Sequence, residues 1–242
     1  MSKYLEERRK AADELKSSFS TLSDKKQAWE DLHRLTSDPD SDVRRVAANA
    51  LGSTFSFLSE KKLAWEDPQR LSLGSMFSFL PDKKQAWEDL HRLTSDTDSD
   101  VRRGAANALG NAFSHVPDKK QAWEDLIKLT SDNDSDVRWR AASALGWAFS
   151  FVPDKKQAWE DLHRLTSNTD DYVRRGAANA LGNAFSFVPD KKQAWDDLQR
   201  LISDPESFVR RGAASAIGSA FSLVPDKEQA WEDLIWLTSD AD

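Results

Sequence analysis

The stretch RRGAANALGNAF occupies residues 102–113, and the same twelve residues return at 174–185. Between these copies, residues 138–149 carry RWRAASALGWAF, in which tryptophans replace an Arg and an Asn. Copies this similar indicate a tandem array of repeats. In such an array the repeat unit determines the fold, so it is considered before local helix or strand propensity. The first questions are therefore the length of the unit and the side on which those tryptophans lie.

A second recurring element, AW(E/D)D, sets the period of the array. Its tryptophans are Trp29, Trp65, Trp87, Trp123, Trp159, Trp195 and Trp231. Successive spacings are 36, 22, 36, 36, 36 and 36 residues, so one copy is 14 residues short. That copy passes from AWEDPQRL (64–71) to SLGSMFSFLPDKK without the segment that in the next copy is TSDTDSDVRRGAAN. The sequence predicts a 36-residue unit with a truncated second copy.

Each full unit has the pattern of a helical hairpin. In one copy the apolar residues of 122–129 recur on one helical face, which predicts a first helix that begins near Asp118. Pro117 suits this helix start, because its missing N–H would have no intrahelical partner. After a turn, Ser135 is the expected N-cap of the second helix, since its hydroxyl can accept from an unpaired backbone N–H. The equivalent residues are Ser41, Ser99, Asp171 and Ser207.

The second helix has two arcs of different chemistry. At 100° per residue, the apolar and small residues of 101–113 fall on one arc, where they allow close helix approach. Polar residues fall on the opposite, outward arc: Arg103, Gly104, Asn107 and Asn111. In the copy 138–149, Trp139, Ser143 and Trp147 are four residues apart and form one row on that arc, with Arg140 beside them.

The recurring pattern D-x-x-V-R-x-x-A-A-x-A-L-G resembles that of HEAT-like repeats, in particular the type named after phycobilisome lyases. It is present as SDVRRVAANALG (41–52), SDVRRGAANALG (99–110), SDVRWRAASALG (135–146), DYVRRGAANALG (171–182) and SFVRRGAASAIG (207–218). The resemblance covers nearly the whole chain. It implies an all-α fold, an α-solenoid of antiparallel helical hairpins whose second helices line a concave surface. It implies less about function, because the family includes scaffolds, lyase subunits and other enzymes.

One solenoid over residues 1–242 is the predicted domain organisation. Residues 1–22 match a second helix and form an N-terminal capping half-repeat, and residues 226–242 form a C-terminal half-repeat. In the truncated repeat, Pro68 replaces a Leu and predicts a kink over residues 60–80. At the C-terminal end, Trp236 replaces an Arg or Lys on the outer arc, which suggests either a cap contact or self-association.

Composition and motifs exclude several function classes. The net charge of -7 argues against wholesale attraction to nucleic acid or to an anionic membrane. The chain has no cysteine and no apolar run of bilayer length, and its charged start is unlike a signal peptide, so the cytoplasm is the expected location. The loop DTDSD (96–100) lacks the glycine and glutamate of a calcium loop, and capping explains it better.

No residues support an enzyme, a metal or a cofactor. His33, His91 and His163 share one position at the edge of the first helix, about 20 Å apart across two stacked units, too far to chelate one ion. The chain has no His-Glu pair of the deoxyhypusine hydroxylase type, no Ser/His/Asp grouping and no phosphate loop. The expectation is a non-enzymatic protein without a cofactor.

The Arg-Arg pairs have two roles. The first arginines lie near the apolar arc and face the turn aspartates, so we expect a half-buried Asp–Arg ladder; these are Arg44, Arg102, Arg138, Arg174 and Arg210. The second arginines lie on the outward arc, together with asparagines and with no acid on that stripe. The predicted binding surface consists of Trp139, Arg140, Ser143, Trp147, Arg45, Arg103, Asn107, Asn111, Arg175, Asn179, Asn183 and Arg211.

The sequence therefore favours a protein–protein interaction scaffold that binds an acidic, extended partner segment on this surface, with the tryptophan row as its central anchor. Nucleic-acid or phosphate binding on the same basic stripe is a second hypothesis, with bases stacking on the tryptophans. A lyase or chaperone subunit follows only from the family resemblance. Sequence drift in a recently duplicated array would explain the tryptophans without any ligand.

Overall fold

The computed structural model describes residues 3–19, 21–22, 25–63 and 83–238. Within these ranges the chain consists of α-helices, turns and one short 3-10 helix, with no strand. Backbone contacts group the chain into two compact units, residues 1–118 and 119–242, which are described separately. No helix in the described ranges is long and apolar enough to cross a bilayer.

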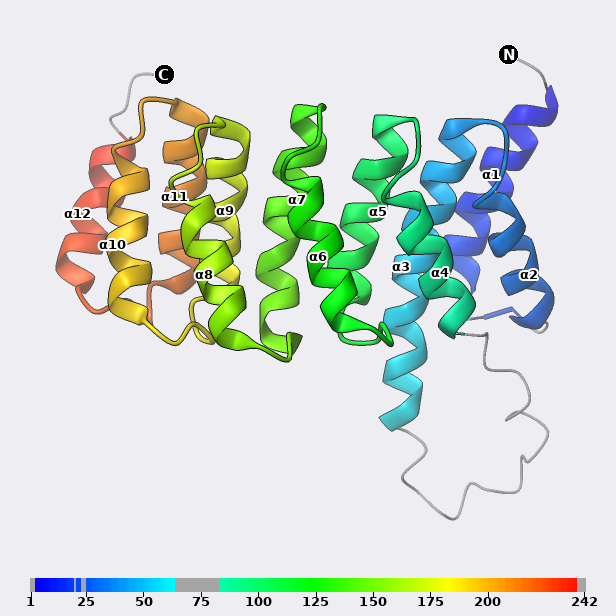
Figure 1. The fold of residues 1–242 in the computed structure, drawn as a ribbon, viewed down its shortest axis with the longest axis horizontal. Helices are drawn as coiled ribbons and strands as arrows, with labels where there is room; N and C mark the ends of the chain where they lie inside the picture. The colour runs from blue at the N-terminus through cyan, green and yellow to red at the C-terminus, as the bar shows by residue number, and fades with distance from the viewer. Residues whose placement is uncertain (1–2, 20, 23–24, 64–82, 239–242) are drawn as a thin grey trace. The chain divides into compact units, whose positions relative to one another are not determined.

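In the described part of residues 1–118, one helix is followed by two hairpins. Figure 1 labels these helices. They are α1 (Lys3–Ser18), α2 (Lys25–Leu35), α3 (Ser41–Leu63), α4 (Lys83–Leu93) and α5 (Ser99–Ala112). The helices α2 and α4 are first helices, and α3 and α5 are second helices. The helix α1 packs against α3, as one second helix packs against the next.

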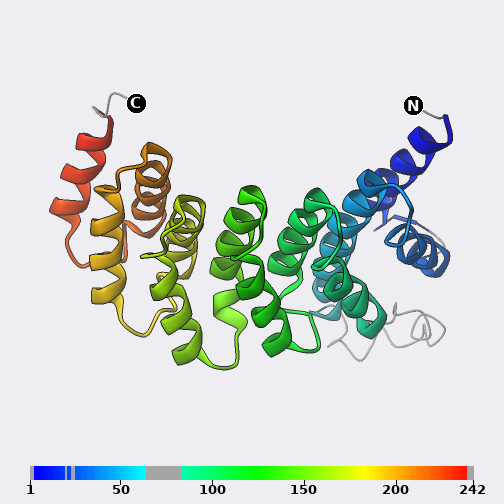
Figure 2. The same ribbon diagram turned by 45° about the horizontal axis from the view of Figure 1, so that its top comes forward.

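The unit of residues 119–242 contains three hairpins followed by one helix. Its helices are α6 (Lys119–Leu129), α7 (Ser135–Ala148), the 3-10 helix η3 (Phe149–Phe151), α8 (Lys155–Leu165), α9 (Asp171–Ala184), α10 (Lys191–Ile202), α11 (Ser207–Ala220) and α12 (Lys227–Thr238). Figure 2 shows two rows in this unit, with the first helices α6, α8 and α10 in one and the second helices α7, α9 and α11 in the other. This arrangement confirms the predicted all-α repeat solenoid.

The periodic tryptophans belong to the core. Their side chains are buried at five described positions: Trp29, Trp87, Trp123, Trp159 and Trp195. The core also contains the second-helix phenylalanines, such as Phe113 and Phe185, which are fully buried. Trp231 on α12 differs, since 60% of it is exposed. A repeat therefore buries its tryptophan only where the neighbouring helices complete the layer.

The N-caps of the second helices lie one residue before the predicted ones. Asp134, not Ser135, is the N-cap of α7, and its side chain accepts from the N–H groups of Asp136 and Val137. Asp98 caps α5 in the same way. The expected N-caps Ser41, Ser99, Ser135, Asp171 and Ser207 are instead the first helical residues. A carboxylate at this place also interacts favourably with the positive end of the helix dipole, which a serine would not.

Buried aspartates connect successive first helices. Asp197 of the AW(E/D)D element is fully buried, and Nδ1 of His163 in the preceding repeat donates to its Oδ2 at 2.6 Å, 34 residues away. His33 donates to Asp89 in the same way, but 56 residues away. The extra separation is 22 residues, the length of the truncated copy. The hairpin of α2 and α3 therefore contacts that of α4 and α5 as consecutive full repeats do.

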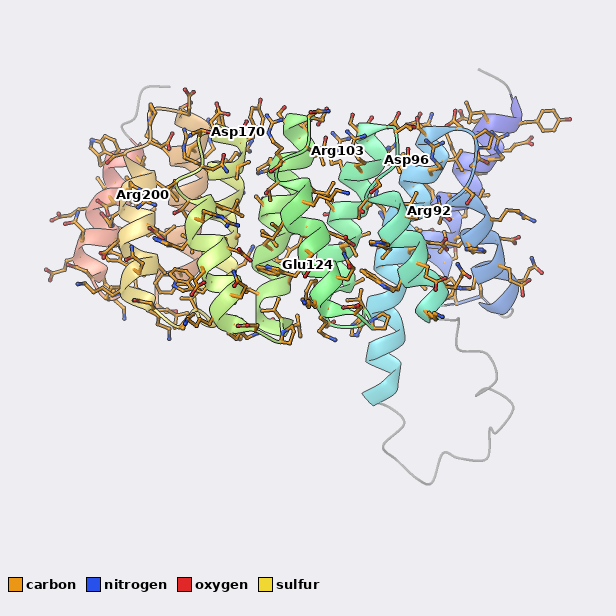
Figure 3. All side chains as sticks on the ribbon, viewed as in Figure 1. Arg92, Asp96, Arg103, Glu124, Asp170 and Arg200 are labelled. Atoms are coloured by element: carbon orange, nitrogen blue, oxygen red, sulfur yellow. The ribbon has the colours of Figure 1, made fainter. Side chains whose placement is uncertain are left out.

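The predicted Asp–Arg ladder is present and has the same register. Arg174 donates through Nε and Nη2 to both oxygens of Asp204, at 2.6 and 2.9 Å, across 30 residues. Arg44 makes the equivalent bidentate pair with Asp96 at 2.8 Å, across 52 residues. Each of these arginines also donates to carbonyls of its own turn, as at Asn168 for Arg174. Figure 3 labels Asp96 and Asp170 in the turns that precede α5 and α9.

The terminal helix α1 uses this ladder too. Arg8 on α1 pairs with Asp38 at 2.8 Å, 30 residues away, so α1 occupies the place of a second helix, as its sequence predicts. The kink predicted over residues 60–80 falls mostly on residues 64–82, which lie outside the described residues. The kink stays a prediction, and so does the organisation of residues 1–242 as a single solenoid domain.

Candidate functional site

A small pocket lies on the second-helix face of residues 119–242. It has a volume of about 160 Å³ and is formed by α7, α9 and α11. Its lining residues are Trp139, Arg140, Ser143, Trp147, Asn179, Asn183, Ser215, Ala216 and Ser219. We call this the tryptophan pocket. The four-residue spacing of Trp139, Ser143 and Trp147 places all three on one side of α7, as the sequence predicts.

Two arginines hold the ring of Trp139 between them. The guanidinium carbon of Arg140 is 4.4 Å from the ring centroid, and that of Arg175 on the next second helix is 4.7 Å away. Each contact lies within cation–π range and contributes about 0.5–2 kcal/mol, depending on its desolvation. Gly176 makes the approach of α9 possible, because a Cβ there would lie 2.7 Å from the carbonyl oxygen of Trp139. The indole is therefore fixed in orientation.

Two buried donors in the pocket have no hydrogen-bond partner within the described chain. Ser143 is 5% exposed, and neither its Oγ nor the Nε1 of Trp139 has a bonded neighbour. Buried polar groups are almost always paired, and leaving one unpaired costs about 1–3 kcal/mol. An indole N–H can only donate, and a hydroxyl can donate as well as accept. The pocket therefore lacks an acceptor.

Trp147 and the neighbouring polar residues form the open side of the pocket. Trp147 is 39% exposed, although it belongs to a well-packed helix. The equivalent residues on the next two second helices, α9 and α11, are Asn183 and Ser219. A large aromatic group thus stands among small polar ones, which gives an incoming chain both an apolar contact and hydrogen-bonding groups.

Charge on the second-helix face differs between the two units, which the sequence analysis missed. In residues 1–118, Arg103 pairs with Asp100 at 2.7 Å and Arg45 with Asp42 at 3.4 Å, each three residues earlier. The statement that no acid occupies this stripe is therefore wrong there. The physical reason is that residues three apart on a helix are neighbours.

On α9 and α11 aromatic residues occupy that preceding position, whereas α7 has Asp136 there. Tyr172 precedes Arg175 by three residues, and Phe208 precedes Arg211 in the same way. Their rings contact each other, with centroids 5.3 Å apart, and Arg175 lies 5.8 Å from the ring of Phe208. An aromatic side chain cannot neutralise an arginine, so Arg175 and Arg211 lack the ion pair that Arg45 and Arg103 make with the residue three positions earlier.

The structure brings together half of the predicted binding residues. Trp139, Arg140, Ser143, Trp147, Asn179 and Asn183 line the tryptophan pocket, with Arg175 on the ring of Trp139. Arg211 is exposed on α11. The remaining four, Arg45, Arg103, Asn107 and Asn111, belong to the unit of residues 1–118. There the amide of Asn107 donates to the Asn49 side chain at 3.3 Å.

Sequence reasoning missed three lining residues, Ser215, Ala216 and Ser219. The signal was available, because Ser215 and Ser219 are 36 residues after Asn179 and Asn183 and occupy the same arc of α11. Among the described residues, no group of three or more histidine or acidic side chains could hold a metal ion. The tryptophan pocket offers aromatic faces, arginines and small polar groups.

The chain matches known repeat proteins in sequence and in structure. The family model described as HEAT repeats matches residues 88–158, 123–218 and 161–242, which together span 88–242. A comparison with curated protein sequences gives no match. Among solved structures, an engineered protein is similar at 27% identity, with a TM-score of 0.57 and 90% of each chain covered.

Two further solved structures agree in fold. One is a designed armadillo repeat protein in complex with the peptide (KR)4, at 21% identity and a TM-score of 0.53, with 90% of this chain and 95% of that chain covered. The other is an archaeal HEAT-like repeats protein from Thermococcus onnurineus NA1, at 17% identity and a TM-score of 0.52, with 99% and 87% covered. The family model that matches is general, so the phycobilisome-lyase type stays a prediction.

Proposed function

Because this chain belongs to the family of HEAT repeats, we propose that it is a non-enzymatic scaffold that binds an acidic, extended segment of a partner protein. The segment lies across the second helices of residues 119–242, with the tryptophan pocket as its anchor. Repeats of this kind are typical of protein-interaction scaffolds, and no catalytic family matches the chain. The cytoplasmic location stays a prediction from the sequence.

The observation that carries this proposal is the pair of unpartnered donors beside two arginines. A carboxylate is a hydrogen-bond acceptor. When a carboxylate side chain of the partner enters and opens the pocket, it can accept hydrogen bonds from the Ser143 hydroxyl and the Trp139 N–H. Arg140 and Arg175 supply the positive charge, and no Asp or Glu lines the pocket. Charge-assisted hydrogen bonds are about twice as strong as neutral ones, so the pocket selects a carboxylate over an amide.

The repeat geometry favours an extended partner. Packed helices lie about 8–10 Å apart, and an extended peptide rises about 3.3 Å per residue, so each second helix spans two or three peptide residues. Arg175 and Arg211 lie at the same position of successive second helices. We therefore expect acidic side chains at about every third residue of the partner. Asn179 and Asn183 can bond the intervening peptide groups, because an amide both donates and accepts.

A designed protein of similar fold supports the proposal that the ligand is a peptide. The designed armadillo repeat protein was solved with a peptide of alternating Lys and Arg. The second-helix face of this chain carries arginines, so the complementary peptide has the opposite charge.

The test is a binding titration with a labelled peptide that carries Glu at every third residue, and a matched peptide with Gln in its place. We expect at least tenfold weaker binding for the Gln peptide and for the variant Trp139→Ala/Trp147→Asn, in which Asn is what the neighbouring copies carry. Ser143→Ala should weaken the Glu peptide more than the Gln peptide. Lys156→Ala, on the exposed first helix α8, is the control and should leave binding unchanged. Equal affinity for the two peptides would overturn the proposal.

A single-stranded oligonucleotide, titrated in parallel, tests the nucleic-acid alternative. Tighter binding of the oligonucleotide than of the Glu peptide, with a steep decrease as salt rises, would replace the proposed partner. The lyase or chaperone reading rests on family analogy alone, and capture of a bilin upon co-expression would be needed to support it. Self-association near Trp236 concerns a different surface.

A further inference from the structure

The outer face of α12 is an uncovered first-helix surface. Trp231, Ile235 and Trp236 are 60%, 50% and 52% exposed. In the complete hairpins the tryptophan equivalent to Trp231 is buried, as Trp123 and Trp195 are at 7% exposure. Large exposed apolar patches on a folded protein mark interaction surfaces. The patch on α12 has the composition of a repeat interface.

The opposite uncovered surface lies between α1 and α2. A cavity of about 900 Å³ opens there, lined in part by Ala11, Leu15 and Leu35. Ala11 is exposed, whereas the equivalent alanines Ala47 and Ala105 are fully buried. Ala105 packs in one cluster with Leu93 of the first helix of its own hairpin. The cavity therefore lies where a first helix would pack beside α1.

One set of hydrogen bonds between consecutive first helices runs from a donor on the earlier helix to an aspartate on the next one. The aspartates Asp89, Asp161, Asp197 and Asp233 each accept a hydrogen bond from the first helix before their own. His163 donates to Asp197, and Gln199, at the same position one repeat later, donates to Asp233 at 2.6 Å. Where that position is an isoleucine, Ile127, the indole of Trp123 donates instead to Asp161 at 3.1 Å.

A second polar contact runs in the reverse direction. Arg200 on α10 donates to the hydroxyl of Thr166 in the preceding repeat at 2.6 Å. Arg92 on α4 donates to Thr36 at 2.8 Å in the same way. Figure 3 labels Arg92 and Arg200 at equivalent positions of their first helices. An arginine on one first helix and a threonine after the previous one are thus a matched pair.

The two uncovered surfaces carry the two halves of the aspartate contact. On α12 the donor position is Ile235, as in α6, so the donor role falls to Trp231, as it does to Trp123. On α2, Asp31 and Arg34 both line the cavity. Asp31 bonds to Gln27 and Arg34 of its own helix, and its side chain is 32% exposed, against 0% for Asp197.

We propose that α12 of one molecule packs into the α1–α2 cavity of a second copy of this chain. There it completes the hairpin of α1, with the Trp231 N–H on Asp31 of the second molecule. The interface joins two different surfaces, so it is heterologous, and it propagates until a ring closes or a filament forms. The proposal is independent of the tryptophan pocket and of its ligand.

The test uses two complementary variants of the full chain in sedimentation velocity. Wild type should increase in weight-average mass with concentration. Trp231→Glu blocks the α12 surface, and Ala11→Glu blocks the cavity; each variant alone should stay monomeric with unchanged helical circular dichroism. Mixed together, they retain one intact surface of each kind and should form a 1:1 dimer that does not grow further. Trp139→Ala/Trp147→Asn should associate as wild type does, which separates this interface from the peptide site.

Three outcomes would overturn the proposal. They are a wild type that stays monomeric up to high micromolar concentration, a mixture of folded variants that forms no dimer, and association that persists in a chain carrying both substitutions. Trp236→Arg restores the residue type of the other copies and reduces the apolar patch, so it should weaken association without unfolding α12.

Discussion

The side chain three residues before each outward arginine decides the charge of the binding face. Where it is Asp42 or Asp100, the arginine is locally neutralised; where it is Tyr172 or Phe208, the arginine keeps its charge. A surface ion pair of this kind stabilises by well under about 1 kcal/mol, so the difference concerns binding more than stability. The charge of the second-helix face therefore depends on aromatic as well as basic residues.

Acid should weaken the ladder between Arg44 and Asp96. Desolvation is the largest influence on Asp96 and raises its pKa. The hydrogen bonds from Arg44 and the Asp98 N–H, with the charge of Arg44, outweigh it and hold that pKa below 3.8. Because the folded-state pKa is depressed, the stabilisation is present above about pH 4 and is lost as pH falls through the folded pKa. Urea unfolding from pH 6 to pH 2.5 should show this loss.

Asp96→Asn is the matched variant for that measurement. At pH 6 it should lower the free energy of unfolding by about 3 kcal/mol, because it leaves Arg44 half-buried without its counter-ion. Below the folded pKa the difference from wild type should shrink. A gap that is as large at pH 2.5 as at pH 6 would show that the pair does not stabilise the protein through charge.

At the scale of the helices, backbone approach between second helices depends on glycine. A Cβ at Gly146 on α7 would lie 2.5 Å from the Cα of Ala180 and 2.7 Å from its carbonyl oxygen, so α9 could not stay in place. At Gly218 on α11 a Cβ would meet nothing within 4 Å. The same residue in the same motif is thus required at one position and replaceable at another.

Alanine substitutions at these two glycines should have opposite signs. Gly146→Ala should destabilise by about 1–3 kcal/mol, because overpacking displaces a helix backbone. Gly218→Ala should stabilise by up to about 1 kcal/mol, because glycine is a poor helix former and the space is open. Paired urea titrations check this. Equal effects of the two changes would mean that helix propensity alone governs the position.

At the scale of the whole molecule, the repeats on either side of the truncated copy make the same contacts as two consecutive full repeats. His33–Asp89 and Arg44–Asp96 keep the geometry of His163–Asp197 and Arg174–Asp204, although each spans 22 more residues. Loop closure becomes only slowly more costly with length, so the chain between two packed repeats can be lengthened at little free-energy cost.

Removing residues 59–80 should therefore leave the array intact. The joined sequence becomes FSFLPDKK, which matches 77–84 and closely resembles FSFVPDKK at 149–156. We expect an unfolding midpoint no lower than that of wild type and the same per-residue helicity. Asp89→Ala should cost the same free energy in both backgrounds, since both retain the His33 contact. A cost confined to the full-length chain would contradict the register.

The sequence by itself determined the helices, their period, the Asp–Arg ladder and the tryptophan row, because each depends on spacing along one chain. It misplaced the helix caps by one residue, where two oxygen-bearing residues stand side by side and only backbone geometry chooses between them. The tertiary structure alone decided that Arg175 closes over Trp139, that Ser143 is buried without a partner, and that repeats on either side of residues 59–80 contact each other. These facts depend on which side chains of different repeats meet, and neighbours in space are set by packing, which a one-dimensional pattern does not encode.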